Sequence, residues 1–327
     1  MAYQSILTEN ETQRAIVLIK KTFQDRLARN LNLRRVSAPL FVLAGTGVND
    51  DLSGTETPVS FNVKGVGEAQ IVHSLAKWKR IALRRYGFTP GKGLYTDMNA
   101  IRPDEIPDRI HSIYVDQWDW EKVITRDQRN FDFLEETVRL IVGAICDTQE
   151  VVFAAYPELS GPISREVSFV TTSELLEKYP NLTPSERERA YVKEHKTAFI
   201  MQIGGALKDG KPHDARASDY DDWDLNGDII VWNDVLDSQL ELSSMGIRVD
   251  AASLKKQLKI AGHEDWAKRE YHKMILADEL PLTIGGGIGQ SRICMQLLNK
   301  AHIGEVQASV WDKKTLDDCA KEGITLL

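Results

Sequence analysis

Hydrophobic side chains near the start of the chain recur at helical spacing. The apolar positions within residues 8–31 lie three or four residues apart: Ile16, Ile19, Phe23 and Leu27. Thr8 and Glu11 have the order of a capping box, in which each side chain bonds the backbone of the other residue. The pattern predicts a long amphipathic helix. An extended run follows at residues 35–42, and Pro39 restricts it to a strand end or a sheet edge.

Later stretches have the same helical period. The first is marked by apolar residues on one face: Phe131, Leu134, Val138, Ile141 and Ile145. A shorter helix is predicted after Thr183, because Pro184 suits a first helical turn and Glu186 completes a capping box. Residues 250–262 and 264–278 are also predicted to be helical.

Strand patterns occur in groups between these helices. Residues 59–63 alternate apolar and polar side chains, as a half-buried antiparallel strand does. Further strands are predicted at residues 110–115, 167–170, 198–203, 228–232 and 239–243. This grouping differs from the regular alternation of a parallel doubly wound sheet, so the expected fold class is α+β, an antiparallel sheet flanked by helices. No linker or repeat divides the chain, and residues 1–327 are expected to form a single domain.

Charge and hydropathy exclude several classes of protein. The 327 residues contain 41 Lys+Arg and 48 Asp+Glu, a formal charge of −7, which disfavours a nucleic-acid partner. No apolar run approaches the roughly 18–20 residues of a membrane span, and the first residues lack a signal-peptide pattern. We therefore expect a cytoplasmic protein with no membrane partner. The cysteines have no spacing suited to zinc: Cys146, Cys294 and Cys319.

Two glycine-rich segments are candidates for a nucleotide site. GALKDGKP at residues 205–212 has Pro212 where a phosphate-binding loop needs a hydroxyl residue for magnesium, so a hairpin turn is the better interpretation. GGGIGQSR at residues 285–292 has Gln290 in place of the third glycine of a dinucleotide fingerprint. What remains is a glycine-rich strand that leads into a helix with Arg292 in its first turns. Taken alone, this pattern suits a packing turn and a nucleotide site equally well.

Polar segments elsewhere in the chain favour the nucleotide site. Arg102 is followed by Asp104 and Glu105, a glutamate follows in a predicted strand at Glu241, and residues 287–292 complete the series. This order resembles the three signature motifs of class II aminoacyl-tRNA synthetases, with the opening helix and the Pro39 strand as the first motif. The resemblance implies the antiparallel sheet of that class, flanked by helices.

Three short stretches narrow the resemblance: HSLAKWKR at residues 73–80, YVDQWDWE at 114–121 and ELSSMGIR at 241–248. They are similar to the ammonia-dependent, A-type asparagine synthetases. The likeness runs from about residue 10 to about residue 311, and the chain has no room for the anticodon-binding domain of the related aspartyl and asparaginyl enzymes. It implies a single catalytic domain that acts as an aspartate–ammonia ligase. Such an enzyme joins L-aspartate and free ammonia by way of a β-aspartyl adenylate, and ATP yields AMP and pyrophosphate.

The resemblance assigns the ATP end of the site. Arg102 is expected to bridge the aspartate β-carboxylate and the α-phosphate, because a rigid cationic fork holds both anions. The alternative for this arginine is a salt bridge to Asp104 or Glu105. Asp228 and Glu241 are the candidates for a Mg²⁺ cofactor, which prefers carboxylate oxygens. Further contacts to ATP are expected from Arg216, Asp221 and Arg292, although the loop that carries the first two also suits an exposed turn.

The aspartate end is assigned in the same way. Lys79 and Arg248 suit the α-carboxylate of the substrate. The residues expected around the α-ammonium are Ser74, Gln117 and Asp119, and the remaining substrate-binding candidates are Ser243 and Ser244. The other basic residues of the helical stretch around Lys79 are expected to form a solvated face: Lys77, Arg80, Arg84 and Arg85.

Ammonia must reach the adenylate as the neutral nucleophile. By resemblance Asp50 is expected to attract ammonium and accept its proton; Asp51 is the alternative, and either residue also suits a loop cap. The resemblance further implies a homodimer. Two other functions remain open. One is an aspartyl or asparaginyl synthetase paralogue, tRNA-charging or tRNA-independent, and the other is a protein that only binds ATP or an amino acid.

Overall fold

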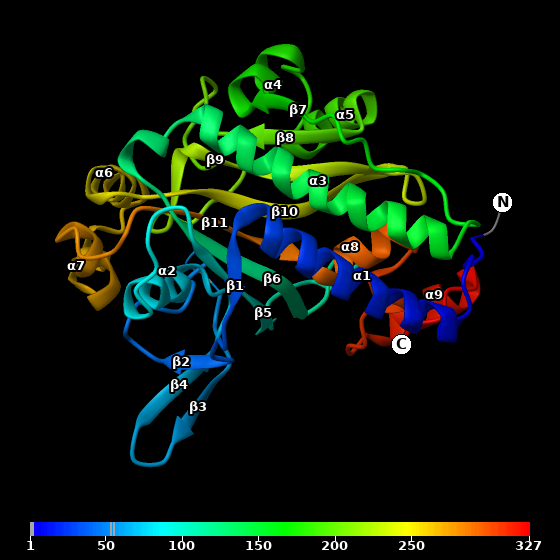
Figure 1. Ribbon diagram of the computed structural model, residues 1–327, viewed down its shortest axis with the longest axis horizontal. Coiled ribbons are helices and arrows are strands. Elements are labelled where there is room, and N and C mark those ends of the chain that lie inside the picture. The colour runs from blue at the N-terminus through cyan, green and yellow to red at the C-terminus, as the bar shows by residue number, and fades with distance from the viewer. Residues whose placement is uncertain (1–2, 53, 55) are drawn as a thin grey trace.

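A large sheet forms the centre of the protein (Figure 1). The computed structural model describes residues 3–52, 54 and 56–327, and within them the sheet has eight strands. Their spatial order is β1 (Leu33–Arg35), β5 (Gly93–Ile101), β6 (Tyr114–Val123), β11 (Thr283–Gly289), β10 (Ser238–Arg248), β9 (Asp221–Asn233), β8 (Thr197–Met201) and β7 (Ser168–Thr171). The inner pairs are antiparallel, and the two outermost pairs, β1 with β5 and β7 with β8, are parallel. The predicted α+β class is confirmed.

Capping residues fix where two of the predicted helices begin. Helix α1 (Glu9–Leu31) begins with a capping box, in which the backbone N–H of Glu11 donates to Thr8 Oγ1 at 3.3 Å. Helix α5 (Pro184–His195) begins with Thr183 as its cap, Pro184 in the first turn and Glu186 as the capping partner. Both predictions are confirmed, because a cap depends only on residues within four positions.

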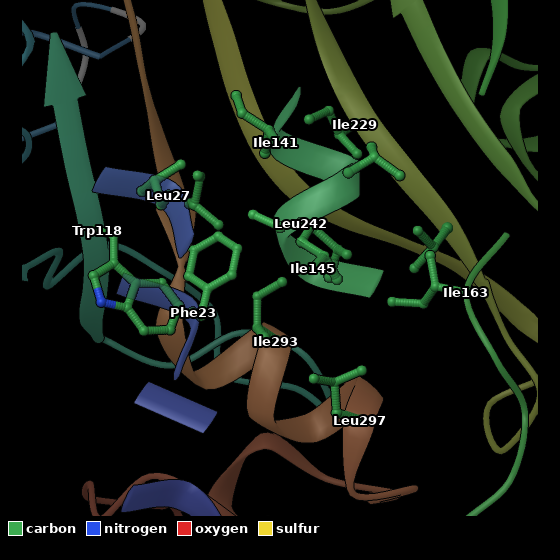
Figure 2. Packing of buried hydrophobic residues seen from close by; sticks show 14 of the residues in the cluster. Phe23, Leu27, Trp118, Ile141, Ile145, Ile163, Ile229, Leu242, Ile293 and Leu297 are labelled. Carbon is green, nitrogen blue, oxygen red and sulfur yellow. The ribbon is translucent and has the colours of Figure 1, made fainter. Parts of the chain in front are cut away.

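One face of the sheet is covered by α1, α3 (Phe131–Ala155) and α8 (Gln290–Leu297), and the main hydrophobic core lies between these helices and the strands. Figure 2 shows Phe23 and Leu27 of α1 and Ile293 of α8 near Trp118 of β6. The rings of Phe23 and Trp118 lie 4.6 Å apart between centroids. This packing fixes β6 and therefore the side chains that β6 carries on its other face.

The opposite face has a different cover, because side chains alternate along each strand. Phe199 and Ile229 belong to the main core, whereas Ile200 and Ile230 pack under α4 (Thr172–Lys178) and α5. Helix α2 (Ala76–Arg85) lies over β6, next to α6 (Ala251–Ala261) and α7 (Glu270–Leu276). The remaining elements are a small sheet of β2 (Phe41–Leu43), β4 (Gly67–Ile71) and β3 (Ser60–Val63), the short helices η1 (Arg126–Gln128), η2 (Glu264–Lys268) and η3 (Ile303–Glu305), and α9 (Lys313–Glu322).

Three sequence predictions differ from the structure. The strand predicted at residues 110–115 is wrong except for its last two residues, because the backbone N–H groups of Ile110 and His111 bond the Asp108 side chain at 2.8 Å. These local bonds make a turn, and β6 starts only at Tyr114. The run at residues 35–42 divides around Pro39 into β1 and β2, and residues 264–278 divide into η2 and α7. Within the described residues, every helix is too short or too polar to cross a membrane.

Candidate active site

A cavity of about 520 Å³ opens on the sheet face that carries α2. It is lined by most of the candidate residues: Asp50, Ser74, Lys79, Arg102, Gln117, Asp119, Arg216, Asp221, Asp228, Glu241, Ser244 and Arg248. A second cavity of about 210 Å³ contains Arg292 and shares Arg102, Gln117 and Glu241 with the first. Residues as far apart in the chain as Asp50 and Arg292 therefore lie in two adjoining polar cavities.

Strand β6 supplies the floor of this cavity. Its alternation sends Trp118 and Trp120 into the core and turns Gln117, Asp119 and Glu121 to the opposite face. The neighbouring strand β11 leaves space for them, because a Cβ at Gly285 would overlap the Glu121 carboxylate and a Cβ at Gly287 would overlap the Gln117 amide. The glycine-rich run is therefore required by the side chains of the adjacent strand.

Arg248 lines the cavity and is already paired with carboxylates of the protein. Its Nε donates to Glu121 Oε1 at 3.0 Å, one terminal nitrogen donates to Glu121 Oε2 at 2.8 Å, and the other binds Asp221 Oδ1. All three side chains are buried. Burial acts to raise the pKa of Glu121, but the charges of Arg248 and Lys79 lower it overall. The ion pairs hold three strands, β6, β9 and β10, in fixed relation.

Lys79 forms a second buried anchor. Its ammonium binds the Asp119 carboxylate and donates to the carbonyl oxygens of Trp120 at 2.8 Å and Gly286 at 3.0 Å. The carboxylate of Asp119 also accepts the backbone N–H of Leu75 at 3.2 Å. Burial raises the pKa of Asp119 despite the lysine. The start of α2 is thus fastened to β6 and β11.

Arg102 lines both cavities and, unlike Arg248 and Lys79, does not bind a carboxylate of the described residues. In the part of the chain that the structure describes, its guanidinium bonds only the carbonyl oxygen of His73, at 3.2 and 3.4 Å. The alternative expected from sequence, a salt bridge to Asp104 or Glu105, is not formed, and Asp104 instead accepts the backbone N–H of Thr57 at 2.8 Å. This cation remains available to an anionic ligand.

Asp228 and Glu241 project into the cavity from the neighbouring strands β9 and β10. Burial raises the pKa of Asp228 to about 7; the negative charge of Glu241 adds to this, and Arg216 opposes it. Arg216 donates to Asp228 Oδ1 at 2.6 Å and also binds the Ser244 hydroxyl. The described residues contain no cluster of three or more potential metal ligands. Two carboxylates and one arginine therefore face the same space.

The two candidates for ammonia handling are separated by the fold. Asp50 lines the cavity, and its Oδ2 accepts the hydroxyls of Ser74 at 2.7 Å and Tyr220 at 3.2 Å. Its other oxygen caps the loop by accepting the backbone N–H of Leu52 at 2.8 Å. Asp51 turns away from the cavity to Lys77 and Arg269. Only Asp50 is in position to meet a ligand.

Three other residues lie elsewhere than the sequence predicts. Ser243 is buried outside the cavity, because a β-bulge between Glu241 and Ser243 shifts the alternation of β10 and brings Ser244 to the site instead. Lys77 and Arg80, expected on a solvated face, are buried. Their partners are distant in the chain. Lys77 binds Asp219, and Arg80 donates to the carbonyl oxygens of Val249 and Pro281. Arg84 and Arg85 are exposed as expected.

Two functional side chains were missed. Glu121 holds Arg248, and Tyr220 bonds Asp50. A signal for the first was present, since Gln117, Asp119 and Glu121 have the two-residue spacing of one strand face. Tyr220 lies in a loop, where no periodicity indicates direction.

Comparisons with known proteins agree with this geometry. The sequence profile of the aspartate-ammonia ligase family matches residues 10–323. The aspartate–ammonia ligase of Levilactobacillus brevis is 55% identical over 100% of this chain and 98% of its own length. That of Lactobacillus acidophilus is 56% identical over 99% of this chain and 98% of its own length.

Solved structures show the class of fold. The asparaginyl-tRNA synthetase of Entamoeba histolytica, in complex with asparaginyl-adenylate, superposes with a TM-score of 0.68 at 13% identity, over 91% of this chain and 66% of that one. The enzyme from Pyrococcus horikoshii gives 0.68 at 13% identity, over 92% and 70%. The fold is that of the class II synthetases. Together with the family match, this shows that the chain belongs to the aspartate–ammonia ligases, enzymes that make asparagine from aspartate and ammonia.

Proposed function

We propose that this aspartate–ammonia ligase activates its substrate as a β-aspartyl adenylate. A β-carboxylate oxygen of L-aspartate attacks the α-phosphorus of ATP, and pyrophosphate leaves. The nitrogen of ammonia then attacks the β-carbonyl carbon and loses a proton, and AMP leaves with the shared oxygen. The observation that carries the proposal is Arg102, a cation that lines both cavities and, among the described residues, bonds only the carbonyl oxygen of His73. It is placed to bridge a carboxylate and a phosphate and to stabilise the charge between them.

The larger cavity suits aspartate as the substrate. Lys79 and Arg248 line the cavity and are proposed to attract the α-carboxylate. Both cations are already paired within the protein, so the substrate would share them with those carboxylates. Asp119 and the hydroxyl of Ser74 are placed for the α-ammonium. Gln117 and Ser244 add uncharged hydrogen-bonding groups at the same surface. Because the floor is held by buried ion pairs, it does not adapt to a longer chain. A substrate with one more methylene would place its carboxylate away from Arg102, a discrimination of about 1–3 kcal/mol.

Mg²⁺ fits the pair Asp228 and Glu241. Both side chains line the cavity and offer the carboxylate oxygens that this ion prefers. When bound, the ion neutralises charge on the phosphates of ATP. Arg216 and Arg292 lie beside these two carboxylates, since Arg216 bonds Asp228 and Arg292 bonds the backbone carbonyl of Glu241 at 3.0 Å. Both arginines are then placed for phosphate oxygens, and Asp221 orients Arg216 at 3.9 Å.

Asp50 is proposed to receive ammonium at the cavity wall and accept its proton, because its carboxylate faces the site and is held by Ser74 and Tyr220. By the same family resemblance, the working enzyme is proposed to be a cytoplasmic homodimer of single-domain chains with no nucleic-acid partner.

The test is to supply oxygen-18 in the β-carboxylate of aspartate, with ATP, magnesium and ammonium. An adenylate transfers one label to AMP for each asparagine formed. Formation of ADP, or of AMP without the label, would reject the proposed intermediate. Parallel reactions with glutamine or tRNA in place of ammonium should give no product, and charged tRNA would support the synthetase paralogue instead.

A further inference from the structure

A charged cluster with a buried centre lies behind Asp50, and the proposed reaction does not use it. Its members come from the loop before β3, from α2, from the loop before β9 and from the region of α7: Asp51, Lys77, Asp219, Arg269 and His272. At its centre, the Nζ of Lys77 lies 2.7 Å from Asp219 Oδ2 and 3.0 Å from Asp51 Oδ2. The side chain of Lys77 is fully buried. One ammonium therefore binds two carboxylates from distant parts of the chain.

Both carboxylates are chain neighbours of groups at the cavity wall. Asp51 follows Asp50, and Asp219 precedes Tyr220. The wall groups are themselves joined, since the Tyr220 hydroxyl donates to Asp50 Oδ2 at 3.2 Å. Lys77 thus fixes the two backbone segments on which the Asp50–Tyr220 contact depends. The helix α2 that carries Lys77 also begins beside Ser74, the second hydroxyl on Asp50.

The outer members keep the cluster in one arrangement. His272 donates from Nε2 to Asp219 Oδ2 at 3.0 Å, because a carboxylate accepts and the imidazole nitrogen must carry the hydrogen. Arg269 donates to Asp51 Oδ2 at 2.8 Å and lies over the Trp266 ring at 4.3 Å from its centroid. Each carboxylate therefore has a second partner besides Lys77.

Burial of these charges costs free energy, which apolar side chains in the same place would not require. Burial acts to lower the pKa of Lys77, but the nearby carboxylates, Asp219 first, raise it overall, so the lysine is charged. Buried ion pairs are often no more stabilising than hydrophobic side chains of the same volume. A charged lysine that reaches two loops gives them a fixed separation, which an apolar side chain does not.

We propose that Lys77 is a positioning residue for Asp50, which it holds against Tyr220 through Asp51 and Asp219. The inference rests on the proposed role of Asp50 in handling ammonia. Loss of the lysine should let the Asp50 loop and the Tyr220 loop separate, and should therefore weaken the ammonia step more than activation of aspartate.

The test is a double-mutant cycle between Lys77→Met and Asp50→Asn. Two reactions are measured: asparagine formation against ammonium concentration, and aspartate-dependent exchange of pyrophosphate into ATP without ammonia. Lys77→Met should lower kcat/KM for ammonium about tenfold and leave the exchange rate within about twofold. In the Asp50→Asn background the same substitution should cause little further loss, because the residue through which it acts is already altered.

If Lys77→Met fails to fold, Asp51→Asn takes its place in the cycle. This substitution is a smaller disturbance, since the Asp51 side chain is 34% exposed. Arg84→Gln is the matched control. Arg84 lies on the same helix and pairs with Glu279 at 2.9 Å, with 46% of its side chain exposed, so both reactions should be unchanged.

Two results would overturn the positioning role. One is a full additive loss in the Asp50→Asn background, and the other is an equal fall in exchange and in asparagine formation. Failure of the proposed function looks different, because the unaltered enzyme would then show no pyrophosphate exchange. The cycle on asparagine formation would still decide whether Lys77 acts through Asp50.

Discussion

Two arginines of the active site differ in what they already bind. Arg248 is 2% exposed and contacts the carboxylates of Glu121 and Asp221. Arg102 lies at the junction of the two cavities and bonds the carbonyl oxygen of His73 at 3.2 and 3.4 Å. The first is part of the framework, and the second keeps most of its hydrogen-bonding capacity for a ligand. The same residue type therefore supports the fold in one place and chemistry in the other.

Removal of Arg248 should have the largest effect on stability. Arg248→Met leaves Glu121 buried without its main partner, which is expected to lower the free energy of unfolding by about 3–5 kcal/mol. Urea denaturation measures the change. The double variant Arg248→Met/Glu121→Gln should recover part of the loss, because Glu121 no longer leaves an unpaired buried charge. Asp221 keeps Arg216 at 3.9 Å as its remaining cation in both variants. If the single and double variants are equally unstable, the loss comes from the missing arginine side chain and not from the unpaired charge of Glu121.

Removal of Arg102 should lower kcat and leave the stability of the protein nearly unchanged. Arg102→Gln is expected to lower kcat about 100- to 1000-fold, as loss of a preorganised cationic donor does. Its free energy of unfolding should stay within about 0.5 kcal/mol of the parent. Both values come from steady-state kinetics and denaturation of the same preparation. A loss of stability comparable with that of Arg248→Met would remove the distinction between the two arginines.

The glycine-rich strand allows a test between these extremes. In Gly287→Ala the new methyl overlaps the Gln117 amide, so Gln117 must move and the KM for aspartate should rise about tenfold. Gly205→Ala is the control, because a Cβ there meets no atom within 4 Å. An unchanged KM in Gly287→Ala would show that Gln117 does not contact the substrate.

A partly exposed carboxylate should give the smallest effect. Asp250 caps α6, where its Oδ1 accepts the backbone N–H groups of Ala252 and Ser253 at 3.0 Å. Burial acts to raise the pKa of Asp250, but these bonds, with Arg129 and Arg126, lower it to about 2. The stabilisation is therefore complete above the ordinary pKa of about 4 and is lost as pH falls through about 2.

Asp250→Ala should accordingly cost about 1 kcal/mol at neutral pH. Unfolding measured at a series of pH values should show this difference shrink below about pH 4. A difference that is independent of pH would mean that the charge of Asp250 has no part in the cap.

Features that depend on neighbours in the chain were predictable from the sequence. The caps at Thr8 and Thr183 are examples, and the α+β class followed from the grouping of strands and helices. The sequence predicts a solvated face for Lys77, because nothing near this lysine in the chain indicates its partner Asp219, 142 positions away. Ser243, a predicted substrate-binding residue, lies outside both cavities, because a β-bulge cannot be seen in the alternation of side chains that it interrupts.

The family resemblance supplied what spacing did not. It named the residues of the site, and the structure brings nearly all of them to adjoining cavities. It did not indicate which charges are already paired. That information depends on burial and on partners such as Glu121, which only the folded chain reveals.

The position of β11 has a consequence for synthesis of the protein. This strand lies between β6 and β10 and pairs Thr283 with Val123 and Ile284 with Ile247, yet it is the last strand in the chain. Until residue 289 has left the ribosome, the strands of the sheet form two separate groups. The edges of β6 and β10 that pair with β11 then have no partner. Such edges are sites of intermolecular pairing. Nascent or truncated chains that end before β11 are therefore the forms of this protein most exposed to aggregation and most dependent on chaperones.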